Sequence, residues 1–314
     1  MLSFLKNWTL PVAITVGTIL YLLFAYVPAL DSTSKVLGPL CETLLPISIF
    51  FTLFITFSKV DYHLMRFTRW HGAVLVTQIL FVAALIIAAY FTNGAIKLTL
   101  EAILVCVIAP CASASPVVTA KLGGNLTTMT TFVLLSSIVM AVLIPLVFPI
   151  LEPTQGTSFI VAFLLILHKL ALVLLLPLLL GAIVRHWIKP LYEFFKRTPD
   201  LGFYCWSFSL AITSGITVKN ILHSEAGVAL LIAIAVLTVI TAFIQFRIGR
   251  ALGDHFGEKI CCGQAMFQKN TGLAIWIAYV YLSPVASIGA GCYVLWQNII
   301  NSYELWQLRH EAKA

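Results

Sequence analysis

Long apolar runs separated by short polar connections dominate the chain. Runs of about 20 residues are long enough for an α-helix to cross a bilayer, and their number predicts ten membrane spans. The spans are residues 9–29, 37–58, 71–91, 97–120, 127–151, 159–184, 201–218, 226–249, 259–282 and 285–305. The pattern therefore predicts an all-α polytopic membrane protein with ten transmembrane helices and no inserted soluble domain.

Two of the runs are interrupted near their middle. The fourth contains APCASASP at residues 109–116, and the ninth contains QAMFQKNTG at residues 264–272. Unwound backbone survives inside a membrane only where it is buried in protein or lines a wet cavity, and a cation such as Lys269 is costly at that depth without a partner. We therefore expect spans four and nine to be discontinuous helices. The alternative is two packing kinks stabilised by Ser and Thr.

The two interruptions lie about 155 residues apart, which is half of the chain. Five spans place the end of the first half outside if the chain begins inside, so the second half has the opposite orientation. Broken helices at matching places in two such halves indicate the binding site of a secondary transporter. The predicted repeats are residues 1–151 (spans one to five) and 159–307 (spans six to ten).

Composition and charge support a membrane protein. The chain is 61% hydrophobic and 10% charged, with a mean hydropathy of +1.01, whereas soluble domains are about 25% charged. With the N-terminus inside, fourteen Lys and Arg residues fall on the inner side, against Lys35, Lys97 and Lys219 outside. This bias predicts two cytoplasmic termini in a plasma or inner membrane. It also accounts for the net charge of +7 without a nucleic-acid partner.

The apolar run after Lys6 is longer than the core of a signal peptide, so we expect it to be the first span and not a cleaved leader. The seven cysteines lie in or near apolar runs, and their number is odd. We therefore expect packed, reduced thiols and no disulfide framework.

Polar residues in and around the two breaks are the candidate site. The first break offers hydroxyls, the second offers amides, a hydroxyl and a cation, and the last span offers two amides that either line the site or bond a neighbouring helix. The predicted substrate-binding or coupling residues are Ser113, Ser115, Pro116, Thr119, Thr130, Gln268, Lys269, Asn270, Thr271, Gln297 and Asn298. No metal ligand is predicted among them.

Three further polar residues are not expected to bind substrate or a coupling ion. Glu42 and Glu101 lie near span ends, so we expect them at the membrane interface. Gln245 lies near the inner end of span eight, so we expect it to be solvated.

An enzyme is not indicated. The sequence has no paired aspartate motif for magnesium, no Gly-x-Ser-x-Gly elbow and no His-Glu-x-x-His helix, and its histidines do not cluster at metal-ligand spacing. No catalytic residue and no cofactor is predicted.

At the breaks the chain resembles the bile acid:sodium symporter family. The resemblance rests on PCASASP at 110–116, Gly124–Asn125 and Ser136–Ser137 in the first half, and on QKNTGLA at 268–274, Pro284 and WQN at 296–298 in the second. It implies a panel domain of spans one, two, six and seven, and a core domain of spans three to five and eight to ten in which the broken helices cross. It also implies alternating access and an organic-anion substrate such as a bile acid, a steroid sulfate or a keto acid.

The sequence departs from that family at the positions of its sodium ligands. Ser115 is kept, but Pro116 replaces an Asn and Ala265 replaces a Glu. The fifth-span hydroxyl positions fall on Met129 and Val133, although Thr130 and Thr131 are adjacent. Sodium dependence is therefore not carried over.

Lys269 stands where the family has a Gln. We expect its ammonium to fill the space of a sodium ion and to donate to Ser115, Thr130, Gln268 or carbonyls of the breaks. A lysine in this place could also load and release a proton, which would make the carrier proton-linked.

Two other functions stay open. Arsenical resistance permeases are distant relatives with a Cys in their broken fourth span, so Cys111 could serve an arsenite efflux permease through a soft thiolate ligand. A membrane receptor that binds without transport is the second alternative. The sequence does not indicate an oligomeric state.

Overall fold

The computed structural model describes residues 9–153, 156–198 and 200–311. It is 86% helical, and no strand is formed among the described residues. The predicted all-α class is confirmed. Residues 1–8, which hold the expected inner Lys6, lie outside the described part.

The helices follow the apolar runs in order. Their bounds are α2 Thr9–Tyr26, α3 Asp31–Ser58, α4 Arg69–Tyr90, α5 Gly94–Ile108, α6 Ser115–Lys121, α7 Leu126–Leu151, α8 Phe159–Leu170, α9 Leu176–Trp187, α10 Lys189–Arg197, α11 Leu201–Leu222, α12 Val228–Phe256, α13 Lys259–Phe267, α14 Thr271–Tyr281 and α15 Pro284–Glu311. Two 3₁₀ turns, η1 Pro28–Leu30 and η2 Tyr62–Leu64, follow α2 and α3, and a π-helical turn, η3 Ala171–Leu175, joins α8 to α9.

Within the described residues, six helical segments are long and apolar enough to cross a membrane by themselves. They are Ser32–Ser58, Arg69–Tyr90, Leu126–Leu151, Phe159–Trp187, Leu201–Leu222 and Val228–Phe256. Val12–Tyr26 and Thr271–Tyr281 are shorter apolar helices. The chain is therefore an integral membrane protein, and the predicted total of ten spans stays a prediction.

Several helices extend beyond the predicted spans, because hydropathy marks the lipid-facing part of a helix and not its polar ends. Helix α3 begins at Asp31 and continues through Pro39 and Pro46. Helix α12 continues to Phe256. The connection at residues 185–200 contains α10, an additional short helix that opens with a proline in its first turn, a position where the missing N–H costs nothing.

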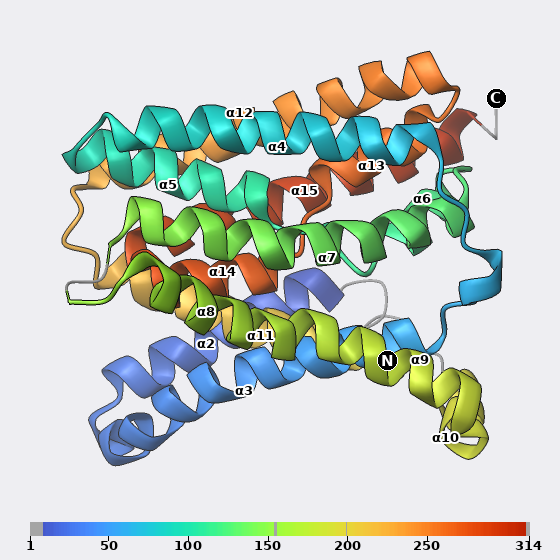
Figure 1. Cartoon of the computed structure of the whole chain (residues 1–314). Helices are drawn as coiled ribbons and strands as arrows, with labels where there is room; N and C mark the ends of the chain where they lie inside the picture. The colour runs from blue at the N-terminus through green and yellow to red at the C-terminus, as the bar shows by residue number, and fades with distance from the viewer. Residues whose placement is uncertain (1–8, 154–155, 199, 312–314) are drawn as a thin grey trace.

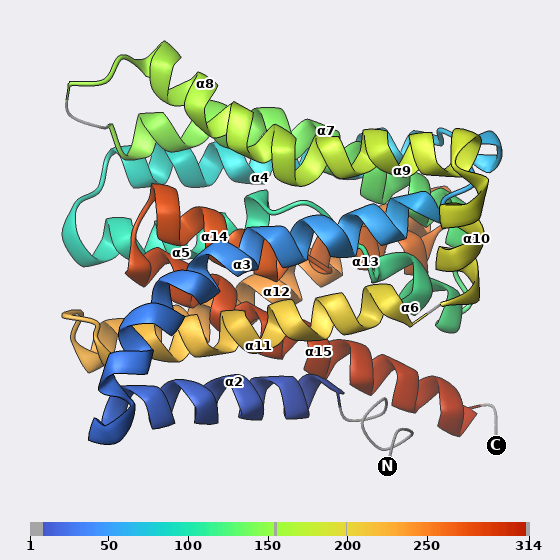
Figure 2. The same ribbon diagram turned by 90° about the horizontal axis from the view of Figure 1, so that it is seen from below.

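The long helices lie side by side across the view of Figure 1, with α2 and α3 along the bottom and α4 and α12 along the top. Helix α11 packs mainly on α2 and α3, and α3 also packs on α9 (Figure 2). On the other side, α12 packs on α13 and α15, and α5 packs on α4 and α15. The half-length helices α13 and α14 are thereby mostly buried among full-length ones, whereas α6 lies nearer the surface, with Val117 55% exposed.

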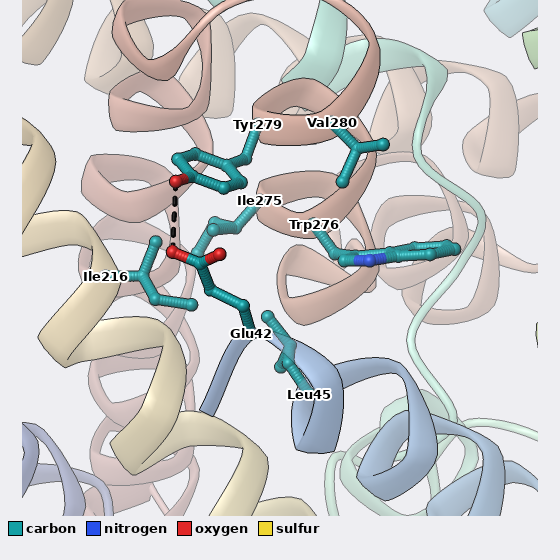
Figure 3. Close-up of a pocket in the computed structure, with 7 residues that line it drawn as sticks. All are labelled: Glu42, Leu45, Ile216, Ile275, Trp276, Tyr279 and Val280. Carbon is teal, nitrogen blue, oxygen red and sulfur yellow. Dashed lines mark hydrogen bonds between the residues drawn. The ribbon is translucent and has the colours of Figure 1, made fainter. Parts of the chain in front are cut away.

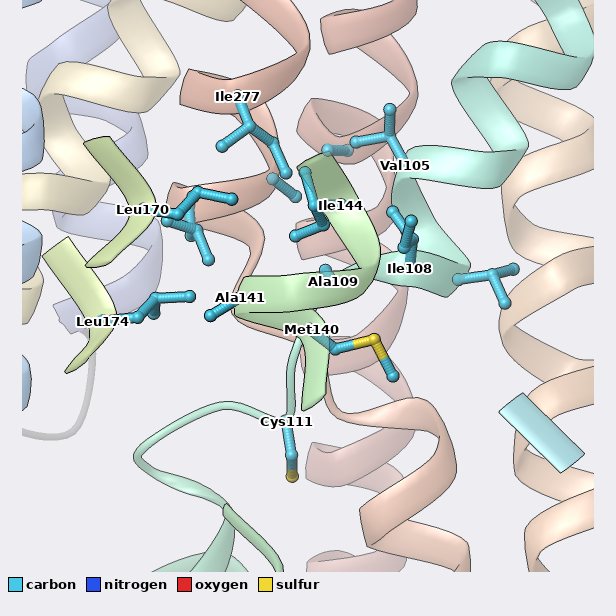
Figure 4. Packing of buried hydrophobic residues seen from close by; sticks show 14 of the residues in the cluster. Val105, Ile108, Ala109, Cys111, Met140, Ala141, Ile144, Leu170, Leu174 and Ile277 are labelled. Carbon is cyan, nitrogen blue, oxygen red and sulfur yellow. The ribbon is translucent and has the colours of Figure 1, made fainter. Parts of the chain in front are cut away.

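Close packing holds the half-helices in place. Gly249 of α12 lies against α13, where an added Cβ would be 2.5 Å from the carbonyl oxygen of Cys262. Around the end of α5, buried apolar side chains from α5, α7 and α14 pack together, including Ile108, Ile144 and Ile277 (Figure 4). The broken backbone at the end of α5 therefore lies in a densely packed apolar interior.

Candidate functional site

The two predicted interruptions are present, and the structure pairs them with each other. Helix α5 ends at Ile108 and α6 begins at Ser115, while α13 ends at Phe267 and α14 begins at Thr271. Cys111 and Lys269 form an isolated antiparallel bridge. The N–H of Ala112 donates to the carbonyl of Gln268 (2.9 Å), and the N–H of Asn270 donates to the carbonyl of Pro110 (2.8 Å). Backbone groups that leave their helices thus satisfy each other, as the bilayer interior requires.

Neighbouring helices complete the first break. Gln78 of α4 donates its Nε2 to the carbonyls of Val107 (2.7 Å) and Ala109 (3.1 Å), which have no partner in α5. Ser136 of α7 accepts from the N–H of Cys111 (3.1 Å). The Cys111 thiol donates to Ser115 Oγ (3.2 Å). Gln78 and Ser136 therefore hold the peptide units that the prolines release.

The second break is held mainly by α15. Gln297 accepts from the N–H of Lys269 through Oε1 (3.0 Å) and donates Nε2 to the carbonyl of Lys269 (3.3 Å). Tyr293 donates its hydroxyl to the carbonyl of Phe267 (2.7 Å) and accepts from Gln245 Nε2 (2.9 Å). The carbonyl of Lys269 also accepts from the N–H of Thr271 (2.9 Å), so Gln297 is the partner of the N–H and a second donor to the carbonyl.

Asn270 starts the second half-helix. Its Oδ1 accepts from the N–H of Leu273 (3.2 Å), so it is the N-cap of α14. Thr271, 8% exposed, is the first residue of that helix. A capped N-terminus at the break directs a partial positive charge toward it.

Lys269 is the ionisable group between the two breaks. Its residue is 1% exposed, and no described residue accepts a hydrogen bond from its Nζ. The Oε1 atom of Gln268 is likewise buried without a donor. The thiols of Cys106 and Cys111 lie close enough to interact electrostatically with the ammonium. The hydrogen bonds expected from Lys269 to Ser115, Thr130 and Gln268 are therefore not formed in this conformation.

The other predicted residues divide into two groups. Ser115, Pro116 and Thr119 are buried on α6, where the Thr119 hydroxyl has no partner, and Ser113 is half-buried in the break itself. In contrast, Thr130 donates its hydroxyl to Leu126 O in its own helix (2.7 Å).

Asn298, like Thr130, forms its hydrogen bond within its own helix. It is half-buried and donates Nδ2 to Val294 O (2.7 Å). Of the two amides predicted on the last span, Gln297 therefore contacts the break and Asn298 bonds within α15.

The expectation that Gln245 is solvated is wrong. Gln245 is fully buried and donates to the hydroxyl of Tyr293. Glu101, which we expected at the membrane interface, is 0% exposed, and its carboxylate lies 3.6 Å from Lys97 Nζ. Burial depends on how each helix is turned toward its neighbours, which distance from a span end does not reveal.

The sequence reasoning also missed residues that hold the breaks, Gln78, Ser136 and Tyr293. Gln78 carried a usable signal, because a lone amide in the middle of an apolar run needs a partner inside the membrane. Ser136 entered only as part of the Ser136–Ser137 pair that carries the family resemblance, and Tyr293 carried no signal, since tyrosines are common in membrane helices without any special role.

Comparison with known proteins identifies the family. Residues 46–224 match the Sodium Bile acid symporter family. That range runs from the middle of α3 to the end of α11 and includes the first break, but not the second. A search of curated proteins finds no match. Because the match covers more than half of the sequence, the chain belongs to the Sodium Bile acid symporter family, a family of membrane transporters.

Proposed function

We propose that this protein is a secondary transporter of an organic anion that works by alternating access and does not require sodium. The observation that carries the proposal is Lys269, a buried cation without a hydrogen-bond partner at the point where two broken helices pair. Family membership supports transport in preference to an enzyme. The solute class and the coupling are inferred from the site.

We propose ten segments that each span the membrane, arranged as two inverted repeats. In chain order the first repeat is α2, α3, α4, α5 with α6, and α7. The second is α8 with α9, α11, α12, α13 with α14, and α15. In both, the fourth segment is the broken one, which supports the repeat. Both termini are then cytoplasmic, in agreement with the positive-inside bias.

Alternating access needs two sets of helices that move relative to each other. The packing of α11 on α2 and α3, and of α3 on α9, supports a panel of these helices. The packing among α4, α5, α12, α13 and α15 supports a core that carries both breaks. Paired breaks joined by backbone hydrogen bonds are suited to move as one unit.

Lys269 replaces sodium in this proposal. Three of the positions at which the family places oxygen ligands hold Ala265, Met129 and Val133, whose buried side chains offer no oxygen. A sodium ion a few ångströms from an ammonium would be repelled by several kcal/mol at an effective dielectric constant of about 20. A fixed charge at the pairing point makes the ion unnecessary. A proton on the same lysine is the remaining route to ion coupling.

The charge of the site favours an anionic solute. Neither break contains Asp or Glu, and α6 and α14 both begin there, with partial positive charge at their N-termini. A buried cation without a partner is costly, so an anion that approaches the breaks reduces that cost. A carboxylate or sulfate of the bile acid, steroid sulfate or keto acid type fits this requirement.

No observation favours arsenite efflux or a receptor without transport. Cys111 is buried, and burial among apolar groups disfavours the thiolate that a metalloid requires. We therefore propose neither function.

Uptake by purified protein in liposomes tests the proposal. The probes are labelled taurocholate, oestrone sulfate and pyruvate, one for each solute type, with sodium replaced by potassium or choline. We expect at least one probe to enter at the same rate in all three salts. An absolute sodium requirement would contradict the proposal, and so would stabilisation by cationic solutes with none by anions.

A further inference from the structure

A second polar cluster lies away from the breaks, where three helices meet. The Tyr279 hydroxyl of α14 donates to Glu42 Oε1 of α3 at 3.0 Å (Figure 3). Lys219 Nζ of α11 lies 2.9 Å from the same oxygen. Lys219 Nζ also lies 5.8 Å from the centre of the Tyr279 ring. One carboxylate oxygen thus joins two helices of the proposed panel to a half-helix of the proposed core.

The cluster faces the outer side if the proposed topology holds. Glu42 lies in the half of α3 nearer its N-terminus, and Lys219 and Tyr279 lie in the last turns of α11 and α14. The side chains of Glu42 and Lys219 are 36% and 42% exposed. A solute in the outer medium can therefore reach the ion pair, in contrast to Lys269.

A small cavity of about 60 Å³ adjoins the carboxylate. Apart from Glu42 and the Tyr279 ring its lining is apolar, with Leu45, Ile216, Ile275, Trp276 and Val280. This is space for a few heavy atoms, about the share of two water molecules in the liquid. It admits the leading end of an amphipathic solute, and the whole solute passes only if α3 and α14 separate.

Two other ion pairs each lie within one of the two helix sets. Arg185 of α9 pairs with Asp61, which follows α3 (2.6 Å). Arg250 of α12 pairs with Glu304 of α15. The Glu42 cluster is therefore placed where alternation between the two sets would have to break it.

We infer that Lys219 and Tyr279 form an outer binding site for the carboxylate of the transported solute, which Glu42 occupies in this conformation. An ammonium and a phenol donating to one oxygen are what a solute carboxylate requires, because hydrogen bonds to a charged group are the stronger ones. An entering anion takes the place of Glu42, and the bond that joins α3 to α14 is lost. This inference rests on the proposed function, since it requires an anionic solute.

Exchange of one carboxylate for another is energetically modest. The Glu42–Lys219 pair is partly exposed, and such pairs are worth a factor of about two to five in an equilibrium constant. Glu42 therefore keeps the site closed, but a solute carboxylate can still compete with it for Lys219 and Tyr279.

Initial uptake rates from the outer side, measured with cholate and pyruvate, whose charged group is a carboxylate, test the inference. Glu42→Gln keeps an acceptor for Tyr279 but removes the competing charge, so the half-saturating concentration should fall about two- to fivefold. Lys219→Gln should raise it by at least the same factor. In the Lys219→Gln background, Glu42→Gln should have no further effect. Asp61→Asn, which removes an ion pair at the opposite end of α3, is the matched control and should leave the value unchanged.

A second readout does not depend on turnover. Ile275, 2% exposed, lines the cavity behind Glu42. In a Cys41→Ser background, a cysteine introduced by Ile275→Cys should react faster with an impermeant maleimide from outside when a transported anion is present or when Glu42→Gln is added.

The outcomes are distinct. If Glu42→Gln lowers thermal stability while labelling and half-saturation do not change, the cluster only ties helices together and the inference is wrong. If the wild type transports an anion and Lys219→Gln has the same half-saturating concentration, the inference is also wrong while the proposed function stands. If no anion is transported by or stabilises the wild type, both are wrong.

Discussion

The two breaks differ in length and charge although they pair with each other. The first, between α5 and α6, leaves six residues outside helices, and its side chains are neutral. The second, between α13 and α14, leaves three residues outside helices and includes Lys269. The first is held from α4 and α7 through Gln78 and Ser136, and the second from α15 through Gln297 and Tyr293.

This difference separates two tasks. Side chains of neighbouring full-length helices form hydrogen bonds to the backbone of both breaks, and amides and hydroxyls are sufficient for this support. The chemistry of the site comes from the breaks' own residues, and there the second break alone supplies a charge. Loss of the charge should therefore impair transport, whereas loss of a supporting side chain should reduce stability.

The largest expected effect is on transport by Lys269→Met. Removing the cation should lower anion uptake about tenfold or more. A tenfold loss corresponds to about 1.4 kcal/mol of interaction between Lys269 and the solute. Thermal stability should be unchanged or higher, since a buried charge without a partner is costly. Uptake in liposomes and the thermal midpoint in detergent measure the two quantities.

Two variants make this comparison specific. Cys111→Ala changes the residue that pairs with Lys269 on the neutral break, and it should retain most of the transport. Lys169→Met removes an exposed lysine of α8 and should have no effect. Equal uptake by Lys269→Met and the wild type would refute the role of the charge.

A smaller effect is expected on stability when the support of each break is removed. Gln297→Leu leaves the buried N–H of Lys269 without a partner, while the carbonyl of Lys269 keeps the N–H of Thr271, so the variant should cost about 1–3 kcal/mol. Gln78→Leu removes a donor shared by two carbonyls of the first break and should cost about 1–2 kcal/mol. Denaturant unfolding in detergent gives both values.

Gln307→Leu, which changes an exposed amide near the end of α15, should alter stability by less than about 0.5 kcal/mol. If Gln297→Leu changes the free energy of unfolding no more than Gln307→Leu does, the second break does not depend on the amide of Gln297.

The smallest expected effect concerns the start of α14. Asn270→Ala removes the N-cap hydrogen bond to the N–H of Leu273 and should cost about 1 kcal/mol. Helix α6 begins at the first break after Ala114 without a side-chain cap, so only the second break has this dependence. Asn298→Ala, which removes a bond within α15, is the control and should be near neutral. Equal losses of stability in the two variants would show that the N-cap at the break contributes no more than an ordinary hydrogen bond within α15.

Local sequence was sufficient to predict the helical membrane class and the places of both breaks. Hydrophobic runs of membrane length require helices, because a bilayer offers no partner for an open backbone. Pro110 and Pro116 in one run, and Lys269 with its flanking amides in another, violate that pattern strongly enough to mark the interruptions. The resemblance carried by these same residues predicted the family that residues 46–224 match.

Tertiary structure decided which polar side chains reach the breaks. Gln297 and Asn298 are adjacent in sequence, yet one holds Lys269 and the other bonds its own helix, because successive residues on a helix point about 100° apart. Gln245 and Glu101 lie near span ends, but the rotation of their helices buries both. The joining of Glu42, Lys219 and Tyr279 depends on three helices far apart in the chain. Hydropathy fixes how deep a residue lies in the membrane, and only the packing of helices against one another fixes the direction in which it points.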